Sequence, residues 1–463
     1  MPHPASAGAC AILGTNSLSD NQEIESITSH GLQEMPGFSG SGPEGTAAST
    51  AEEAGISAGT SSLPRVIIAL RHRDFRLFWS GNFLSNIGTW MQNVAQGWLV
   101  LELTNSPFWL GVVSFAATFP ILLLALVGGV IADHVDKRRL LIYTQSAMMV
   151  FAFMMAALAY THHIKVWGIA LLAMGTGIAM ALTTPSYQAL VPQLVPREEL
   201  ANAIALNAAQ FNMSRVVGPT LGGFAMALVG VSGNFFLNGL SYMAVIIALS
   251  RIRYGSSTQL EEGQFWQKLK QGFRYVFGHE EMKLLVWLSA ISSLLAVPYL
   301  AFAPYFAREI LHTNARGLGI LMACSGLGAF LAAVSIAFQG RGKRRGRFVV
   351  FSGLGFYASI IIFTFSRSFK LSCALSAIAG YCMILMVATL NTLLQHLAED
   401  EMRGRVMSIY STAFLGLPPI GSLSAGFMTH YISAPHAIAG MSAVAFAATV
   451  ALFAGKKALR YLD

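Results

Sequence analysis

The sequence predicts an all-α polytopic membrane protein with twelve transmembrane helices, arranged as two six-helix halves. The observations behind this fold class are the composition, the number of long apolar stretches and a motif that recurs in both halves. Of the 463 residues, 54% are hydrophobic and only 11% are charged, whereas soluble domains carry about 25% charged residues. So few charges cannot cover a chain of this length with a polar surface, which excludes a soluble enzyme, a fibrous protein and a disordered chain.

The start of the chain has a different composition from the rest. Its first 63 residues contain seven acidic residues and no Lys or Arg, and they are rich in Gly, Ser and Ala. Such segments bury too little apolar surface to fold, so residues 1–70 are predicted to be a disordered acidic tail. The tail lacks the basic and apolar regions of a signal peptide. Its presence in the mature protein is left open, because a start codon further downstream is the alternative.

A membrane-spanning helix needs about 20 largely apolar residues. Twelve stretches of the chain meet this requirement: 76–101, 109–132, 140–161, 166–190, 204–229, 234–250, 283–306, 317–338, 348–366, 371–395, 407–430 and 436–455. They predict an N-terminal six-helix bundle over 71–253 and a C-terminal six-helix bundle over 283–463.

The segment between the halves, 254–282, is predicted to be a cytoplasmic linker that contains an amphipathic helix. Its apolar side chains can share one helix face: Phe265, Trp266, Leu269, Phe273, Val276 and Phe277. Such a helix lies either on the cytoplasmic leaflet or against the end of the bundle, and the sequence leaves both alternatives open.

The distribution of Lys and Arg predicts the orientation. The loops and termini on one side of the membrane hold 24 of these residues and those on the other side hold five. Cytoplasmic loops carry the excess of positive charge, so both termini are predicted to be cytoplasmic. Because the basic residues are spread over short loops along one face, we expect contact with the lipid bilayer and no nucleic-acid partner.

The two halves resemble each other in their fifth spans. Residues 218–223 read Gly-Pro-Thr-Leu-Gly-Gly, and residues 416–421 read Gly-Leu-Pro-Pro-Ile-Gly about 200 positions later. Matching motifs at matching positions indicate a duplicated six-helix unit. Repeats of this kind build transporters whose binding site lies at the repeat interface near the membrane midplane.

The loop between spans two and three carries a family resemblance. Residues 128–139 read Gly-Gly-Val-Ile-Ala-Asp-His-Val-Asp-Lys-Arg-Arg, which resembles the Gly-x-x-x-Asp-x-x-Gly-Arg-Lys loop of the major facilitator superfamily, with Asp136 in place of the usual Gly. Residues 185–192, 198–203 and 403–406 resemble the bacterial branch with enterobactin-exporter-like and macrolide-efflux-like proteins. The resemblance covers about 70–460 and implies the major facilitator fold and a location in the bacterial inner membrane.

The resemblance also implies gating and coupling residues, which are Gly129, Asp133, Lys137 and Arg138 in the loop and Arg215, Gly218, Pro219 and Gly222 in span five. Asp133, at the cytoplasmic end of span two, can cap a helix N-terminus or pair with a basic residue. Either contact would hold the cytoplasmic side shut. Arg215 is the one charged residue deep within a span, where charges usually face a cavity or a partner. It is either a cargo counter-ion or coupling switch, or it is satisfied by helix-end carbonyls.

Span one carries a polar stripe whose members step by four, three, four and three residues: Asn82, Asn86, Thr89, Asn93 and Gln96. Groups on one helix face would lose their hydrogen bonds in lipid, so they line either a wet cavity or a polar helix contact. Further candidates for the cavity lie on spans four, five, seven and ten: Tyr187, Gln188, Gln210, Ser292, Tyr299, Tyr381 and Asn391.

The sequence therefore predicts a secondary active transporter that exports a medium-sized amphipathic small molecule, siderophore-like or drug-like, by alternating access. We expect protons as the coupling ion, although no Asp or Glu lies mid-membrane in a predicted span. The chain has no phosphate-binding loop for an ATP motor, and we expect a monomer with no cofactor, no metal and no enzymatic activity. The alternatives are metabolite uptake or lysophospholipid flipping by the same fold, and more remotely a transport-inactive sensor or a membrane enzyme.

Overall fold

The structure, a computed structural model, describes residues 65–252, 265–338 and 345–455. Within these ranges, some side chains lie outside the described part: those at 65–66, 125–134, 265–269, 337–338 and 345. The described residues are helical almost throughout and contain no strand. Of the predicted tail, residues 1–64 lie outside the described ranges, while Arg65–Arg71 form the 3-10 helix η1. Ala69 in η1 is fully buried, and its N–H donates to Asn202 Oδ1.

The N-terminal half begins with α1 and ends with a helix that holds two spans. Its long helices are α1 (Arg73–Thr104), α2 (Pro107–His134), α3 (Lys137–Tyr160), α4 (Val166–Leu190) and α5 (Leu200–Arg251), with the 3-10 turns η2 (Val191–Gln193) and η3 (Arg197–Glu199) before α5. Gly230 has φ 73° and ψ 179° inside α5, and a positive φ of this kind favours glycine. The predicted spans 204–229 and 234–250 therefore lie on either side of Gly230.

The C-terminal half has two spans that are broken into shorter helices. Its elements are α7 (Glu280–Leu295), η4 (Val297–Phe302), α8 (Ala303–Tyr305), η5 (Phe306–Ile310), α9 (Ala315–Phe338), α10 (Arg345–Phe365), α11 (Phe369–Leu397), α12 (Asp400–Gly416), α13 (Pro418–Met428) and α14 (Ala434–Gly455). Breaks occur beside Pro298, Pro304 and Pro418, since proline has no N–H to donate and crowds the preceding turn.

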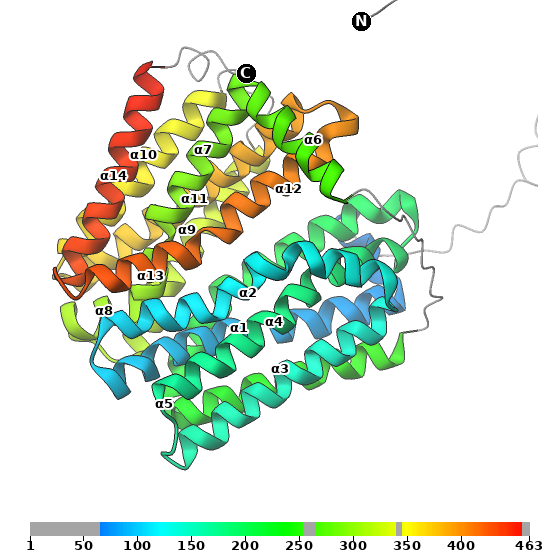
Figure 1. Cartoon of the computed structure of the whole chain (residues 1–463). Helices are drawn as coiled ribbons and strands as arrows, with labels where there is room; N and C mark the ends of the chain where they lie inside the picture. Colours follow the sequence, from blue (N-terminus) through cyan, green and yellow to red (C-terminus); the bar gives the residue numbers. More distant parts are fainter. Residues whose placement is uncertain (1–64, 253–264, 339–344, 456–463) are drawn as a thin grey trace, which may run out of the picture. The chain divides into compact units, whose positions relative to one another are not determined.

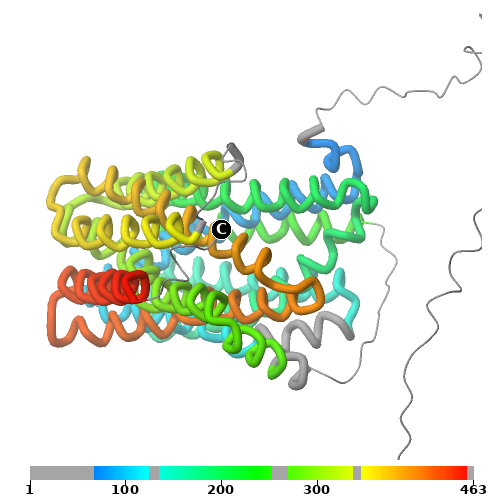
Figure 2. Tube along the Cα trace, turned by 90° about the horizontal axis from the view of Figure 1, so that it is seen from above, coloured from blue at the N-terminus to red at the C-terminus, as the bar shows by residue number. Residues whose placement is uncertain are grey.

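The described helices account for the predicted spans. Ten of them are long and apolar enough to cross a membrane, and one of these ten is the double span Arg197–Arg251. α1 is also long enough to cross a membrane, but its Asn and Gln residues lower its mean hydropathy, so it is not one of these ten. With α1 added and the double span counted as two, the described helices match the twelve spans, and the predicted fold class is confirmed. In Figures 1 and 2 the helices run side by side between two ends of the bundle.

The linker contains the predicted helix as α6 (Phe265–Gly278). α6 packs against α7 and α12: Val276 is fully buried, and Arg405 of α12 donates a hydrogen bond of 2.9 Å to Gln271. Phe273 and Phe277 remain exposed, with their rings stacked 6.0 Å apart. Of the predicted apolar face, Phe265, Trp266 and Leu269 have side chains outside the described part. α6 therefore contacts the bundle and also presents two aromatic rings outward.

The two halves meet through two pairs of glycines. A Cβ on Gly111 of α2 would lie 3.0 Å from Gly426 Cα of α13, and a Cβ on Gly223 of α5 would lie 2.9 Å from Gly319 Cα of α9. Only glycine permits such close approach of two helices. These contacts join span two to span eleven and span five to span eight, which are equivalent pairs if span n corresponds to span n + 6. We call these two glycine contacts between the halves the seam. The seam thus has the symmetry expected of a duplicated unit.

The seam lies towards one end of the bundle. We call this the Asn105 end, because α1 ends there at Asn105, and we call the opposite end the α6 end. In Figure 1 the two halves approach each other at the Asn105 end, near α8 and α13, and diverge towards the α6 end.

Candidate functional site

The polar stripe of α1 connects two cavities. Asn82, Asn86 and Thr89 line the larger one, whose volume is about 600 Å³. Asn93 and Gln96, further along the same helix, line the smaller one of about 240 Å³. A single helix face therefore runs from the α6 end, where α1 begins, through both cavities towards the Asn105 end.

The larger cavity lies within the N-terminal half. Two more of its predicted lining residues, Tyr187 and Gln188 of α4, contribute to it. Gln210 lies behind the stripe and is fully buried, and its side-chain oxygen accepts a hydrogen bond of 3.3 Å from Asn82. Polar lining residues that the sequence analysis did not single out come from α1, α3, α4 and α5: Ser85, Gln145, Thr183, Thr184, Asn207, Asn212 and Tyr242.

The missed residues had little signal in the sequence. Gln145 and Thr183 stand next to other polar residues, Thr144, Ser146 and Thr184, so the sequence does not indicate which of them faces a cavity. Asn207 lies three residues before Gln210 on the same helix face, and only Gln210 was singled out. Tyr242 is fully buried, and its hydroxyl lies 3.2 Å from Thr89 Oγ1 on the stripe. This contact pairs residues 153 positions apart, so the sequence carried no signal for it.

A polar contact also lies along the flank of the α1 stripe. Asn238 of α5 donates a hydrogen bond of 2.6 Å to Gln92, and Ser241 bonds to Asn238. Gly88 lies beside this group, close to the Ser241 and Asn238 side chains. Both alternatives raised for polar residues on span one are thus present on different faces of α1: a cavity lining and a polar helix contact.

The smaller cavity lies between the two halves. Its lining combines residues of α1 and α2 with Pro298, Met322 and Ser422 from η4, α9 and α13. Trp90 lines this cavity, while Phe211 of α5 lines the larger one, and their rings contact each other edge to face with centroids 6.3 Å apart. The Trp90–Phe211 pair therefore stands between the two cavities.

Arg215 lies one turn along α5 from Phe211. Its guanidinium carbon is 5.9 Å from the centroid of the Trp90 ring, and its Nη2 is 4.0 Å from Met383 Sδ of α11 in the other half. No carboxylate of the described residues forms an ion pair with it. A half-buried guanidinium against an aromatic face, without an acidic partner in the described chain, can bind an anionic or aromatic group.

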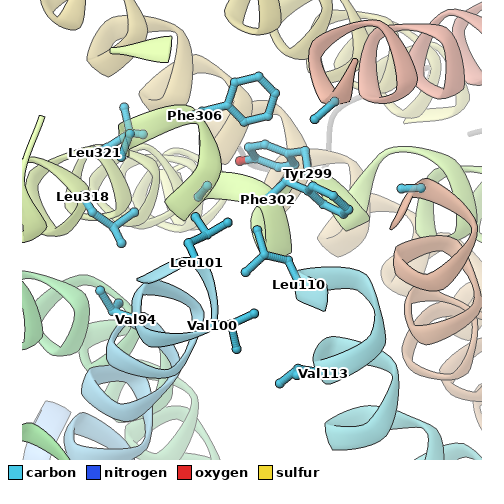
Figure 3. Packing of buried hydrophobic residues seen from close by; sticks show 14 of the residues in the cluster. Val94, Val100, Leu101, Leu110, Val113, Tyr299, Phe302, Phe306, Leu318 and Leu321 are labelled. Atoms are coloured by element: carbon cyan, nitrogen blue, oxygen red, sulfur yellow. The ribbon is translucent and has the colours of Figure 1, made fainter. Parts of the chain in front are cut away.

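An apolar plug closes the Asn105 end. Figure 3 shows Leu101 of α1 and Leu110 of α2 pointing towards the η4–η5 segment, where Phe302 lies close to Leu110. Val100 lies between α1 and α2, and Phe306 lies on the far side of the segment in the same apolar cluster. Phe302 and Val100 are fully buried.

A polar contact supplements the plug. Arg308 of η5 donates a hydrogen bond of 2.9 Å to Asn105 Oδ1, and it crosses from one half to the other. Pro304 of α8 packs close to Gly97 of α1. Both cavities thus lie on the α6 side of a packed barrier.

The family model for transmembrane secretion effectors matches residues 66–460. The chain belongs to this family. It is a transporter of the major facilitator superfamily, as the loop at 128–139 predicted, and it is a multi-pass membrane protein.

Three named proteins have sequences similar to that of this transporter. The staphyloferrin A transporter of Staphylococcus aureus (strain NCTC 8325 / PS 47) is 23% identical, over 75% of this chain and 87% of its own length. The multidrug efflux pump Tap of Mycolicibacterium fortuitum is 23% identical, over 72% and 83%. The enterobactin exporter EntS of Escherichia coli O1:K1 / APEC is 23% identical, over 77% and 85%.

Solved structures show the same fold. A bacterial homologue of the human lysosomal transporter Spinster, in an inward-facing and unoccupied conformation, gives a TM-score of 0.61 at 14% identity and covers 87% of this chain and 97% of its own. A bacterial homologue of the iron transporter ferroportin, in an inward-facing state, gives 0.60 at 16% identity and covers 82% and 98%.

The span-five motif of this transporter holds α5 between two helices. A Cβ on Gly218 would lie 2.9 Å from the Ile87 carbonyl oxygen, and a Cβ on Gly222 would lie 2.9 Å from Met91 Cα, both on α1. The Pro219 carbonyl oxygen faces Gly319 on the other side. The motif therefore packs α5 against α1 within its own half and against α9 of the other half.

The loop motif is described in part. Arg138 donates hydrogen bonds of 2.6 and 2.7 Å to the carbonyl oxygens of Leu249 and Ser250 at the end of α5. Asp136, which replaces the usual Gly, caps α3 by accepting a 2.8 Å hydrogen bond from the Arg139 N–H. Lys137 is the first residue of α3. The side chain of Asp133 and the position of Gly129 in the packing lie outside the described residues.

The predicted cavity residues of the C-terminal half lie elsewhere. Ser292 is fully buried, and its hydroxyl lies 2.5 Å from the Tyr357 hydroxyl in the interior of that half. Tyr299 is buried in the apolar plug, with its hydroxyl 3.4 Å from Ser325 Oγ. Asn391 accepts a hydrogen bond from Gln395, and Tyr381 is half-buried on the same helix, α11. None of these four lines either described cavity.

Proposed function

We propose that this transporter exports a medium-sized amphipathic compound, siderophore-like or drug-like, by alternating access across the bacterial inner membrane. The observation that carries the proposal is the pair of cavities along the α1 stripe, which end at a packed barrier at the Asn105 end. The names of the similar proteins support export of a siderophore or a drug. We also propose a monomer, since both described cavities are lined by residues of one chain.

The proposed orientation in the membrane determines which side the closed end of the structure faces. The α6 end carries the basic loops, including Arg138 and Arg403, so it faces the cytoplasm by the positive-inside rule. The Asn105 end then faces outwards, and it is the end that is packed shut. The structure thus corresponds to an inward-facing state, in which an exported compound enters from the cytoplasm.

Arg215 is the group that contacts the charged part of the cargo. It lies against Trp90, a lining residue of the smaller cavity, although Arg215 itself lines neither described cavity, and an intramembrane charge is costly unless it serves a cavity or a partner. An anionic aromatic group, such as a catecholate, satisfies both the guanidinium and the adjacent Trp90 and Phe211 rings. A proton gradient drives the transport cycle. Either cargo binding at Arg215 or protonation of Asp133 in the loop couples proton movement to cargo transport.

The test is transport into inverted membrane vesicles under an imposed proton gradient, with a panel of siderophores, macrolides and dyes. We expect gradient-driven accumulation of an anionic member of the panel, reduced at least about tenfold by Arg215→Gln, since hydrogen bonds to a charged group contribute about 1.5–3 kcal/mol. Arg367→Gln is the matched control, because Arg367 is an exposed residue between α10 and α11. Asp133→Asn tests the loop in the same assay.

Accumulation of no compound by intact protein would overturn export and favour uptake, lipid flipping or a role without transport. Accumulation that survives both Arg215→Gln and Asp133→Asn would remove these residues from the mechanism and leave the fold intact.

A further inference from the structure

The larger cavity contains buried polar atoms without a protein partner. Gln145 Oε1, the Tyr187 hydroxyl and Asn207 Oδ1 are each buried and form no hydrogen bond with any described residue. They come from three helices, α3, α4 and α5, and all three residues line the same cavity. Gln145 is only 3% exposed. Leaving such atoms unpaired is costly, so their convergence on one cavity indicates a ligand.

The chemistry of these atoms selects the ligand. Gln145 Oε1 and Asn207 Oδ1 are amide oxygens and can only accept hydrogen bonds, while the Tyr187 hydroxyl can donate or accept. A hydroxyl or an amide N–H pairs with these oxygens as they are placed. A carboxylate offers acceptors alone and pairs with these side chains only if both amides turn to present their N–H groups. None of the described residues that line the cavity is charged, which also disfavours an ionised group there.

The rest of the lining is apolar and adaptable. Met148, Met180, Ile204 and Phe211 provide apolar surface beside the amides and hydroxyls, and methionine fits ligands of varied shape. A volume of about 600 Å³ is within the range of about 300–1,000 Å³ that drug-sized ligands occupy.

We propose that this cavity is a subsite, built by the N-terminal half alone, for the uncharged, hydroxyl- or amide-bearing part of the cargo. The inference rests on the proposed function and adds a division of labour: Gln145, Tyr187 and Asn207 bind the neutral part, and Arg215 binds the anionic part. The two positions adjoin each other, because Phe211 lines the cavity and contacts Trp90, against which Arg215 lies. Arg215 itself lines neither described cavity, so one elongated molecule occupies both positions when the Trp90–Phe211 pair moves aside.

Two related probes separate these contributions. Chloramphenicol is uncharged and carries an amide N–H, two hydroxyls and an aromatic ring, and its succinate ester adds a carboxylate. We expect purified protein in nanodiscs to bind both. Gln145→Leu and Asn207→Ala weaken both probes about tenfold, as expected for one lost hydrogen bond in a buried site, whereas Arg215→Gln weakens only the succinate ester.

The control and a second variant keep the test decisive. Gln395→Leu makes the same change at an exposed glutamine of α11 outside the cavity and leaves both affinities unchanged. If Gln145→Leu or Asn207→Ala does not fold, Thr184→Phe fills the cavity from an exposed lining position and abolishes binding of both probes.

The outcomes separate this inference from the proposed function. Unchanged chloramphenicol affinity in Gln145→Leu, Asn207→Ala and Thr184→Phe, or no binding of either probe by the wild type, overturns the subsite. Loss of binding in these variants without gradient-driven transport of any compound by the wild type overturns the proposed function and retains the subsite.

Discussion

At the scale of single residues, Arg138 joins two helices of the N-terminal half. Its side chain donates to two carbonyl oxygens at the C-terminal end of α5, where the helix dipole favours a cation. We expect Arg138→Gln to destabilise the protein by about 1–2 kcal/mol, which lowers the midpoint of thermal unfolding by about 1–3 °C for a chain of this length. Arg139→Gln is the control, because Arg139 is exposed and the Asp136 cap involves only its backbone N–H. Equal midpoints for the two variants would refute this role.

The sequence predicted the cavity residues of α1, because the spacing of polar residues along a single helix shows which of them share a face. The stripe from Asn82 to Gln96 needed only the helical period, and all five members line one of the two cavities. Gln145 and Asn207 were not found in this way, because which polar face of a helix lines a cavity depends on how that helix is rotated in the bundle. The same uncertainty explains why Ser292 lies in the interior of the C-terminal half and not at a cavity.

At the scale of helices, the glycine contact between α5 and α9 sets how closely the two halves approach. We expect Gly223→Val to separate them at the Asn105 end, because a Cβ there would already lie 2.8 Å from the Ala315 carbonyl oxygen and 2.9 Å from Gly319 Cα. Spin labels on cysteines at Glu102 and Arg316, both exposed near that end, report the change as a longer distance in pulsed electron resonance.

The matched control for Gly223→Val is Gly168→Val on α4, where an added Cβ meets nothing within 4 Å. It should leave the label distance unchanged. An unaltered distance in Gly223→Val itself would show that the seam absorbs the extra side chain without opening.

At the scale of the whole molecule, the sequence determined the number of spans and the duplication but not the conformational state. Twelve apolar stretches and repeated span-five motifs follow from composition and spacing. Which end is closed depends on contacts such as Phe302 with α1 and α2, and the same chain must make and break these contacts during transport. The breaks at Pro298 and Pro304 also escaped prediction, because membrane helices tolerate proline when neighbouring groups satisfy the backbone.

The Arg308–Asn105 hydrogen bond favours the closed Asn105 end, because it links the two halves there. Asn105 also ends α1 with φ 47°, so Asn105→Gly keeps the backbone conformation and removes only the acceptor. The bond is partly exposed and is worth about 1 kcal/mol, so the open population should rise about fivefold.

Ser114, which lines the smaller cavity, serves as the reporter. In a cysteine-free background that carries Ser114→Cys, adding Asn105→Gly should make this cysteine react about fivefold faster with an impermeant maleimide applied outside right-side-out vesicles. His162→Gly, at another left-handed position (φ 57°) beyond α3, should leave the rate unchanged, and an equal rate in Asn105→Gly would show that the apolar plug alone keeps this end shut.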